Sequence, residues 1–409
     1  MKGRAKVRIS WRAVVELFCV ATCTVLFLFT AMSIATVVLD GRTAGTRDYI
    51  EYWASGQQLA HHRNPYDAAA LLNLERAQGL PAPISAMVMG NAPPALLLTY
   101  PLGFMGARTG ECIWMLLLLV SLIAAVRLIS AALGSNSQKV SILGYSFAPA
   151  IMCIPSGQMA LFVLLGLALF LRFYQTRPIL AGAALWLCLL KPQIFVPFGL
   201  VMGFWILRNR QIRVLGGAFA AIGASIALIW VLDPRCWDEY LTMMGLMRYD
   251  RLIIPCLSVV LRQSVPSLPF IQYVPVVCGS VWALAFFWRH RTCWDWMEHG
   301  SVVLLVSLLV APYTWFVDQS VALPALLRGA AVTRSRMMVA GLAFATAAIE
   351  LGVATKHDLL HSGLYLWTTP FYLIWYLIAT RSRFAAAGSE NSARTAVSEP
   401  AHSSQQAPV

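Results

Sequence analysis

Long runs of apolar residues, separated by short polar loops, make up most of the chain. These runs are roughly 13 to 27 residues long, which is close to the ~20 residues that an α-helix needs to cross a hydrocarbon core. They lack the alternation of apolar and polar positions that marks the strands of a membrane barrel. The pattern therefore predicts an all-α polytopic membrane protein with about 12 transmembrane helices.

The chain has 409 residues, of which 59% are hydrophobic and 12% are charged. A water-soluble fold of this length could not hide so much apolar surface, so lipid must be the solvent. The net charge of +13 does not indicate a nucleic-acid partner, because Lys and Arg accumulate in cytoplasmic loops to fix orientation.

Charged loops give an expected topology for a bacterial inner (plasma) membrane. The first run, Ala13–Leu39, follows a basic segment but is too long for a signal peptide, so it is interpreted as an uncleaved helix. Basic loops around Arg208, Arg289 and Arg328 are assigned to the cytoplasm. The later expected crossings are Ile113–Ile129, Val140–Ile154, Gln158–Arg172, Pro178–Leu190, Ile194–Leu207, Val214–Leu232, Ile271–Trp288, Gly300–Pro312, Gln319–Leu327, Met337–Ala354 and Gly363–Thr380.

This topology gives one transmembrane domain, residues 1–384, and a disordered cytoplasmic tail, residues 385–409, so both termini are cytoplasmic. Two long loops, 40–110 and 233–269, are extracytoplasmic. Within the first loop, Pro93–Met105 cannot be a crossing without inverting every later loop. Its three prolines favour an interfacial or re-entrant helix instead.

The second outer loop raises two further questions. Cys236 and Cys256 both fall there, and they form either a disulfide or, as the default, two free thiols. The acidic and aromatic residues from Trp237 to Tyr240 could shape an acceptor site, although we favour a segment that lies on the membrane.

The first outer loop contains the best candidates for chemistry. Asp48 precedes an aromatic stretch that begins at Tyr49 and suits a helix at the headgroup level. One interpretation makes Asp48 a simple helix cap. The other makes it a general base, with Glu51, one turn on, as the second candidate.

Lys191 is the single charged residue between Arg177 and Arg208. A cation below the membrane surface needs an anionic partner. We expect a substrate phosphate, with Gln158 and Gln193 as neutral donors nearby. The alternatives are a buried ion pair with Asp318 or extension of the side chain to the interface.

Several short motifs, in this order along Asp48–Pro324, together resemble glycosyltransferase family 87. They are Asp48 with Tyr52-Trp53, Asn64-Pro65-Tyr66-Asp67, Pro93-Pro94, Gly157-Gln158, Lys191-Pro192-Gln193 and Pro312-Tyr313-Thr314-Trp315. The resemblance implies a GT-C-like bundle with extracytoplasmic interfacial helices and a first-loop aspartate that acts as base. The mannosyltransferases of that family tend to carry a histidine pair after the late tryptophan, whereas this chain has Phe316-Val317-Asp318.

We therefore expect an enzyme of class EC 2.4, a polyprenyl-phosphate-dependent hexosyltransferase that acts on an extracytoplasmic glycolipid or glycan, with a mannose-like sugar and inversion. Asp48 is the expected base. The residues expected to contact substrate are Arg47, Glu51, Tyr52, Gln158, Lys191, Gln193, Trp315 and Asp318. No metal or other cofactor is expected. The alternatives are a transporter or flippase of lipid-linked sugars and a non-catalytic assembly partner.

Overall fold

The computed structural model describes residues 44–135, 137–247, 254, 256–355 and 365–381, together with scattered positions between 11 and 35. The predicted first crossing, Ala13–Leu39, lies mostly outside these residues, and the predicted tail, 385–409, lies entirely outside them. Every regular element in the described part of the chain is helical, as the sequence predicts.

Three described helices are long and apolar enough to cross a membrane. They are α5 (Ala107–Ala132), α11 (Ile212–Leu232) and Pro269–His290, in which η6 (Pro269–Tyr273) leads into α14 (Val274–His290). The predicted crossing Met337–Ala354 corresponds to the single helix α17 (Arg336–Thr355), and most of the others correspond to shorter or broken helices, so a total of about 12 crossings stays a prediction.

Shorter helices fill the rest of the bundle. They are α6 (Gln138–Tyr145), α7 (Ala148–Ser156), α8 (Ala160–Phe173), α9 (Pro178–Cys188), η4 (Pro192–Phe195), α10 (Val196–Arg208), α15 (His299–Val310), η7 (Phe316–Ala322), α16 (Leu323–Val332), α17 (Arg336–Thr355) and a helix over residues 368–381. The elements outside the bundle are η1 (Ala44–Thr46), α2 (Tyr49–Ala60), α3 (Ala68–Ala77), η2 (Pro93–Ala95), α4 (Leu96–Thr99), η3 (Tyr100–Phe104), α12 (Cys236–Leu246) and α13 (Leu257–Ser264).

The predicted crossing Val140–Ile154 is not one helix but two, α6 and α7. The break falls between Tyr145 and Ala148 because Pro149 has no backbone N–H to donate to the carbonyl of Tyr145. Proline also disfavours the helical conformation of the residue before it, so the chain reorients there and restarts as α7.

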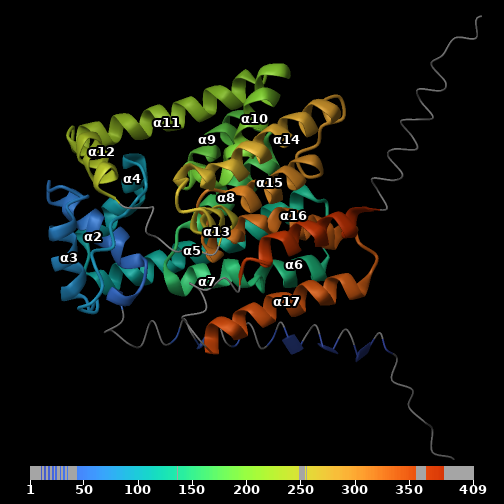
Figure 1. Cartoon of the computed structure of the whole chain (residues 1–409), viewed down its shortest axis with the longest axis horizontal. Helices are drawn as coiled ribbons and strands as arrows, with labels where there is room; N and C mark the ends of the chain where they lie inside the picture. The colour runs from blue at the N-terminus through green and yellow to red at the C-terminus, as the bar shows by residue number, and fades with distance from the viewer. Residues whose placement is uncertain are drawn as a thin grey trace, which may run out of the picture.

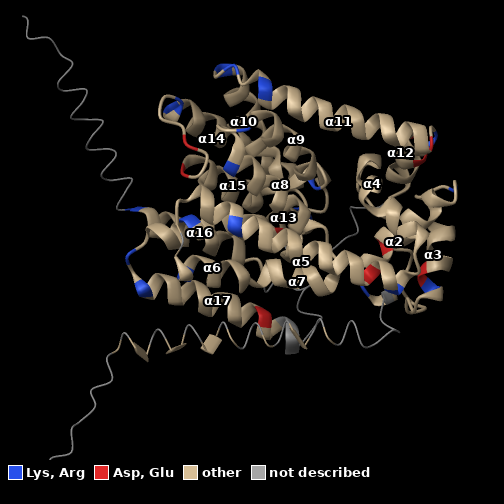
Figure 2. Cartoon of the chain, turned by 180° about the vertical axis from the view of Figure 1, so that it is seen from behind, with Lys and Arg blue, Asp and Glu red and all other residues tan. Residues whose placement is uncertain are grey.

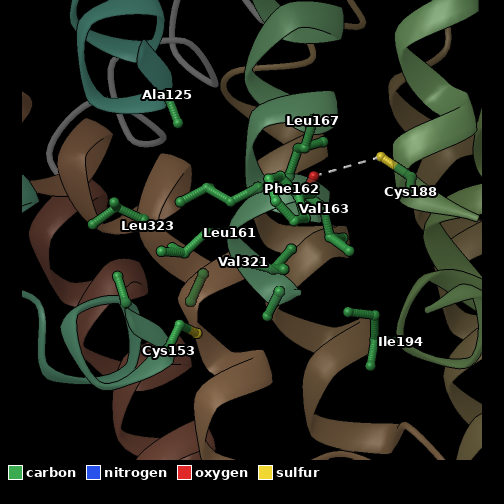
Figure 3. Close-up of a cluster of buried hydrophobic side chains, with 14 of the residues drawn as sticks. Ala125, Cys153, Leu161, Phe162, Val163, Leu167, Cys188, Ile194, Val321 and Leu323 are labelled. Atoms are coloured by element: carbon green, nitrogen blue, oxygen red, sulfur yellow. Dashed lines mark hydrogen bonds between the residues drawn. The ribbon is translucent and has the colours of Figure 1, made fainter. Parts of the chain in front are cut away.

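The centre of the bundle is α8, which is apolar on all sides and almost wholly buried. Figure 3 shows Leu161, Phe162 and Val163 of α8 packed among side chains from α7, η4, η7 and α16. Cys188 of α9 closes one side, and its thiol donates to the carbonyl of Val163 at 3.8 Å.

The outer surfaces of the long helices are apolar as well. On α5 the side chain of Leu116 is 58% exposed, and on α11 that of Val231 is 77% exposed. Water would penalise apolar faces of this extent, whereas lipid acyl chains would solvate them. In contrast, the predicted crossing Gln319–Leu327 has no such face, because its residues in η7 and α16 are buried within the bundle.

The helices of the first outer loop pack together at one end of the molecule, beside α12 (Figure 1). The segment Pro93–Met105 forms three short helices, η2, α4 and η3, instead of the single helix that was predicted, and its prolines account for the breaks. Here α2 packs against the backbone of α4 and η3, because a β-carbon at Gly103 would overlap the backbone of Gly56 and one at Gly56 would overlap the backbone of Thr99. This contact fixes the position of α2.

Charged residues are unevenly distributed along the long axis of the molecule. Figure 2 shows many of the carboxylates at the end formed by α2, α3 and α12, and several groups of Lys and Arg at the opposite end, one of them at the α10–α11 turn. The helices that separate the two ends carry few charges in their middle portions. This distribution agrees with one basic face and one exported face.

Gly103→Ala tests the contact between α2 and η3. A β-carbon at Gly103 would overlap the backbone of Gly56 and lie 2.8 Å from the β-carbon of Ala60. We expect the free energy of unfolding to fall by about 1–3 kcal/mol, measured as a lower melting temperature in detergent. Gly106→Ala is the control, because a β-carbon there meets nothing within 4 Å, and it should leave the melting temperature unchanged.

Candidate active site

Asp48, Glu51 and Tyr52 lie on one face at the start of α2. Their spacing of three and four residues corresponds to about one helical turn, so the three side chains project in the same direction. The carboxylate of Asp48 forms no capping hydrogen bond with the backbone of α2. Asp48 thus occupies the N-cap position of α2, but its side chain does not cap the helix by a hydrogen bond. Instead, Oδ2 of Asp48 accepts a hydrogen bond from Nε2 of Gln158 at 2.7 Å.

Gln158 connects three of the candidate residues. Its Oε1 accepts hydrogen bonds from the hydroxyl of Tyr52 at 3.1 Å and from Nζ of Lys191 at 2.9 Å, while its Nε2 donates to Asp48. The amide thus uses its acceptor toward a cation and its donor toward an anion, which is the one arrangement that satisfies both neighbours.

Gly157 places Gln158 at the end of α7. Its φ of 79° lies in the left-handed region that ends a helix, and a β-carbon there would lie 2.5 Å from that of Tyr49. Trp114 holds the turn by donating from its indole to the carbonyl of Gly157 at 2.6 Å. Glycine is therefore required both for the backbone conformation and for the close approach of α2.

Lys191 is paired with Asp318 inside the protein. Nζ of Lys191 lies 2.5 Å from Oδ1 of Asp318, whose Oδ2 accepts from the backbone N–H of Trp315 at 2.8 Å. The side chain of Asp318 is fully buried, and that of Lys191 is 8% exposed. The structure thus contains the buried ion pair that was one alternative for Lys191. Because a buried charge needs a partner and further hydrogen bonds, each residue satisfies the other.

These residues border a cavity of about 570 Å³. Of the predicted site residues, the cavity is lined by Asp48, Glu51, Tyr52, Gln158, Lys191, Gln193 and Trp315. Asp318 lies behind Lys191 and is not part of the lining. Arg47 is not part of it either, because its guanidinium binds the carboxylate of Glu111 at 2.9 Å.

The second outer loop supplies a wall of the cavity through Tyr240, which accords with the less favoured alternative for the segment Trp237–Tyr240. Arg262, at the end of α13, lines the cavity and donates to Oε1 of Gln272 at 2.8 Å. Tyr240 and Met244 of α12 line it too, so α12 shapes the cavity. The sequence contained one signal for Arg262. This residue is a cation in a predicted outer loop, where cations are uncommon, and the helix that carries it is strongly amphipathic.

Asn91, in the first outer loop, is another lining residue that sequence reasoning missed. Its amide donates to the carbonyl of Leu190 at 2.5 Å, next to Lys191. This bond ties the first outer loop to the turn between α9 and η4. Cys236 and Cys256 are both buried free thiols in the structure, in agreement with the default expectation.

Glu51 differs from Asp48 in its electrostatic environment. Burial raises the pKa of Glu51 from 4.5 to about 8, and the neighbouring carboxylate of Asp48 adds to the shift. At neutral pH the Glu51 side chain is therefore largely protonated. A protonated carboxyl group is a hydrogen-bond donor and not a base.

The sequence model of glycosyltransferase family 87 matches residues 91–340, which is more than half of the chain. This chain belongs to glycosyltransferase family 87. With its apolar helices, this family member is a membrane glycosyltransferase, as the sequence motifs suggested. The matched region contains Gln158, Lys191 and Asp318 but begins after Asp48. No curated protein and no solved structure matches the chain.

The raised pKa of Glu51 predicts a pH-dependent stability. In the unfolded chain this carboxyl group ionises near 4.5, whereas the folded protein keeps it protonated up to about 8. Ionisation therefore favours unfolding, and stability falls as the pH rises between these two values. Glu51→Gln removes this loss.

Below pH 4.5 the Glu51→Gln variant and the parent should have the same melting temperature. Between pH 4.5 and about 8 the melting temperature of the variant should exceed that of the parent by a growing amount, and above that pH the difference should stay constant. Thermal unfolding in detergent at several pH values measures the difference. A difference in melting temperature that does not change with pH would contradict the raised pKa of Glu51.

Proposed function

We propose that this family 87 enzyme transfers a hexose from a polyprenyl-phosphate sugar to an extracytoplasmic glycolipid or glycan, with inversion at the anomeric carbon. The observation that carries the proposal is the position of Asp48. Its carboxylate lines the cavity and is joined through Gln158 to Lys191 on the same wall. The proposed base, Asp48, and the cation Lys191 thus line the same cavity.

In the proposed reaction Asp48 takes the proton of an acceptor hydroxyl while that oxygen attacks the anomeric carbon. The bond between this carbon and the phosphate oxygen breaks, and the phosphate leaves with the bonding electrons. A phosphate ester is a stable anion at neutral pH, so it needs hydrogen-bond donors and cations but no proton. Glycosidases, in contrast, need a second carboxyl group to protonate their leaving oxygen.

The neighbours of Asp48 support its assignment as the base. Glu51, the second candidate, is largely protonated at neutral pH. It is therefore better suited to donate a hydrogen bond to a sugar hydroxyl. Tyr52, Gln193 and Trp315 also line the cavity, and they are the proposed contacts of the sugar and acceptor.

We assign the phosphate of the donor to the part of the same cavity that Lys191 and Arg262 line. Two of the three N–H groups of Lys191 are taken by Gln158 and Asp318, and its charge is neutralised by Asp318. Lys191 therefore offers a hydrogen bond, and Arg262 is proposed to supply positive charge. Asp318 acts by holding Lys191, and Arg47 acts through Glu111 to position the start of α2.

The apolar lining supports a lipid carrier. Met244, Met247 and Val259 border the cavity on the side of α12 and α13. A polyprenyl chain could contact these side chains while its phosphate lies near Arg262. The distribution of charge in Figure 2 supports an exported position for this end of a bacterial inner-membrane protein, with both termini cytoplasmic.

The packing of α8 argues against a transporter or flippase. A transporter must open a polar path to both faces of the membrane. Residues 160–171 of α8 are apolar and closely surrounded by the described helices, as Figure 3 shows for part of this cluster. The polar residues of the site lie at one end of the described bundle.

Asp48→Asn tests the proposed base. We expect hexose transfer to fall at least ~100-fold, because a positioned general base contributes about 10²–10⁴-fold. The assay combines purified protein in lipid with candidate polyprenyl-phosphate hexoses and membrane extract, followed by mass spectrometry of the products. Asp67→Asn is the matched control, since Asp67 caps α3 and does not line the cavity. Unchanged turnover in Asp48→Asn would end the proposal.

Arg262→Gln tests the phosphate contact. We expect KM for the donor to rise about tenfold or more while KM for the acceptor stays the same, because a charge-assisted hydrogen bond is lost. Arg235→Gln is the control on the same outer segment, since the Arg235 side chain is 69% exposed, pairs with Asp233 and does not line the cavity. If the two variants raise the donor KM equally, Arg262 contributes only to the overall surface charge and does not contact the phosphate.

A further inference from the structure

A second cavity, of about 620 Å³, lies at the α10–α11 turn, at the end of the molecule opposite α2 and α12. It shares no lining residue with the candidate active site. Its polar lining includes Tyr174, Asn209, Arg210, Gln211, Arg213 and Trp294. All of these side chains can donate hydrogen bonds, and no carboxylate lines the cavity.

The two arginines have no negative partner within the described part of the chain. Neither Arg210 nor Arg213 forms an ion pair with any residue that the structure describes. The carboxylate of Asp295 interacts electrostatically with Tyr174 but does not line the cavity. Two unpaired guanidinium groups beside one cavity favour a multiply hydrogen-bonded anion such as phosphate.

The backbone at Arg210 is unusual. Its φ of 50° is left-handed, and the N–H of Gln211 donates to the carbonyl of Ile206 at 3.0 Å, so Arg210 takes the position after a helix where glycine is usual. A β-carbon makes this conformation unfavourable by roughly 1 kcal/mol. An arginine here costs stability in the turn, and it places a cation at the mouth of the cavity.

One buried donor also lacks an acceptor. Trp294 lines the cavity, and its indole Nε1 is buried without a hydrogen-bond partner. Leaving a buried N–H unsatisfied is unfavourable, so such a group calls for an explanation. An oxygen of a ligand in the cavity reaches this N–H only if the Trp294 ring turns toward the cavity.

The surroundings of the cavity decide between a soluble anion and a lipid. Leu207 at the end of α10 and Ile212 at the start of α11 flank Arg210, and each is 72% exposed. Farther along α11, Phe219 is 65% exposed. Acyl chains can lie along these apolar helix faces while a headgroup reaches the arginines, as basic pockets between membrane helices allow.

We propose that this cavity binds the phosphate headgroup of an anionic phospholipid, with its acyl chains along α10 and α11. The site is independent of the proposed sugar transfer. Its test uses full-length protein in bilayer nanodiscs that contain either phosphatidylglycerol or the neutral phosphatidylcholine, followed by native mass spectrometry of lipids that remain bound.

We expect phosphatidylglycerol, but not phosphatidylcholine, to stay bound to the parent protein. The double variant Arg210→Gln with Arg213→Gln should retain roughly tenfold less of it. The matched control is Arg289→Gln with Arg291→Gln, which removes the same charge near the end of α14 without touching the cavity, and it should retain the lipid.

Arg210→Gly separates binding from folding. It relieves the left-handed conformation, so it should melt at a higher temperature than the parent in neutral detergent and yet lose bound phosphatidylglycerol. Equal lipid loss in the control variant would overturn the proposal by showing a diffuse attraction. Displacement of the lipid by millimolar inorganic phosphate would overturn it as well, in favour of a site for the free anion.

Discussion

The buried amide of Gln158 is the interaction on which the candidate site depends. It joins a carboxylate from the first outer loop to a cation from the turn between α9 and η4, and that cation is in turn held by Asp318. Each member satisfies a polar group that would otherwise be buried without a partner. The loop and the bundle therefore form one polar assembly, although no two of its charged residues are close in sequence.

The helical class and most of the polar site could be predicted from the sequence, because rare polar residues in an apolar chain are conspicuous. Single polar positions such as Lys191 and Gln158 carry strong information in lipid. The helix break at Pro149 was available from the same chemistry but was obscured by the continuous apolar run around it.

Pairing across long distances in sequence could not be predicted. Arg47 was expected at the substrate, but its partner Glu111 lies 64 residues away, on α5. Arg262 was missed for the opposite reason, since the segment that carries it is surface-like in composition and reaches the cavity only because α13 folds against η6, α14 and α15. Charge and hydropathy indicate the depth of a residue in the membrane, but they do not identify the residue with which it pairs.

The backbone contact of Gly56 with Gly103 has a consequence for how the enzyme selects its substrates. With α2 held by this contact and by Gln158, the wall that carries Asp48 has little freedom to adjust. The facing wall, from α12 and α13, is joined to it mainly through side chains such as the aromatic pair Tyr66 and Tyr240. Substitutions in α12 and α13 can therefore change the shape of the cavity while the wall that carries Asp48 stays in place.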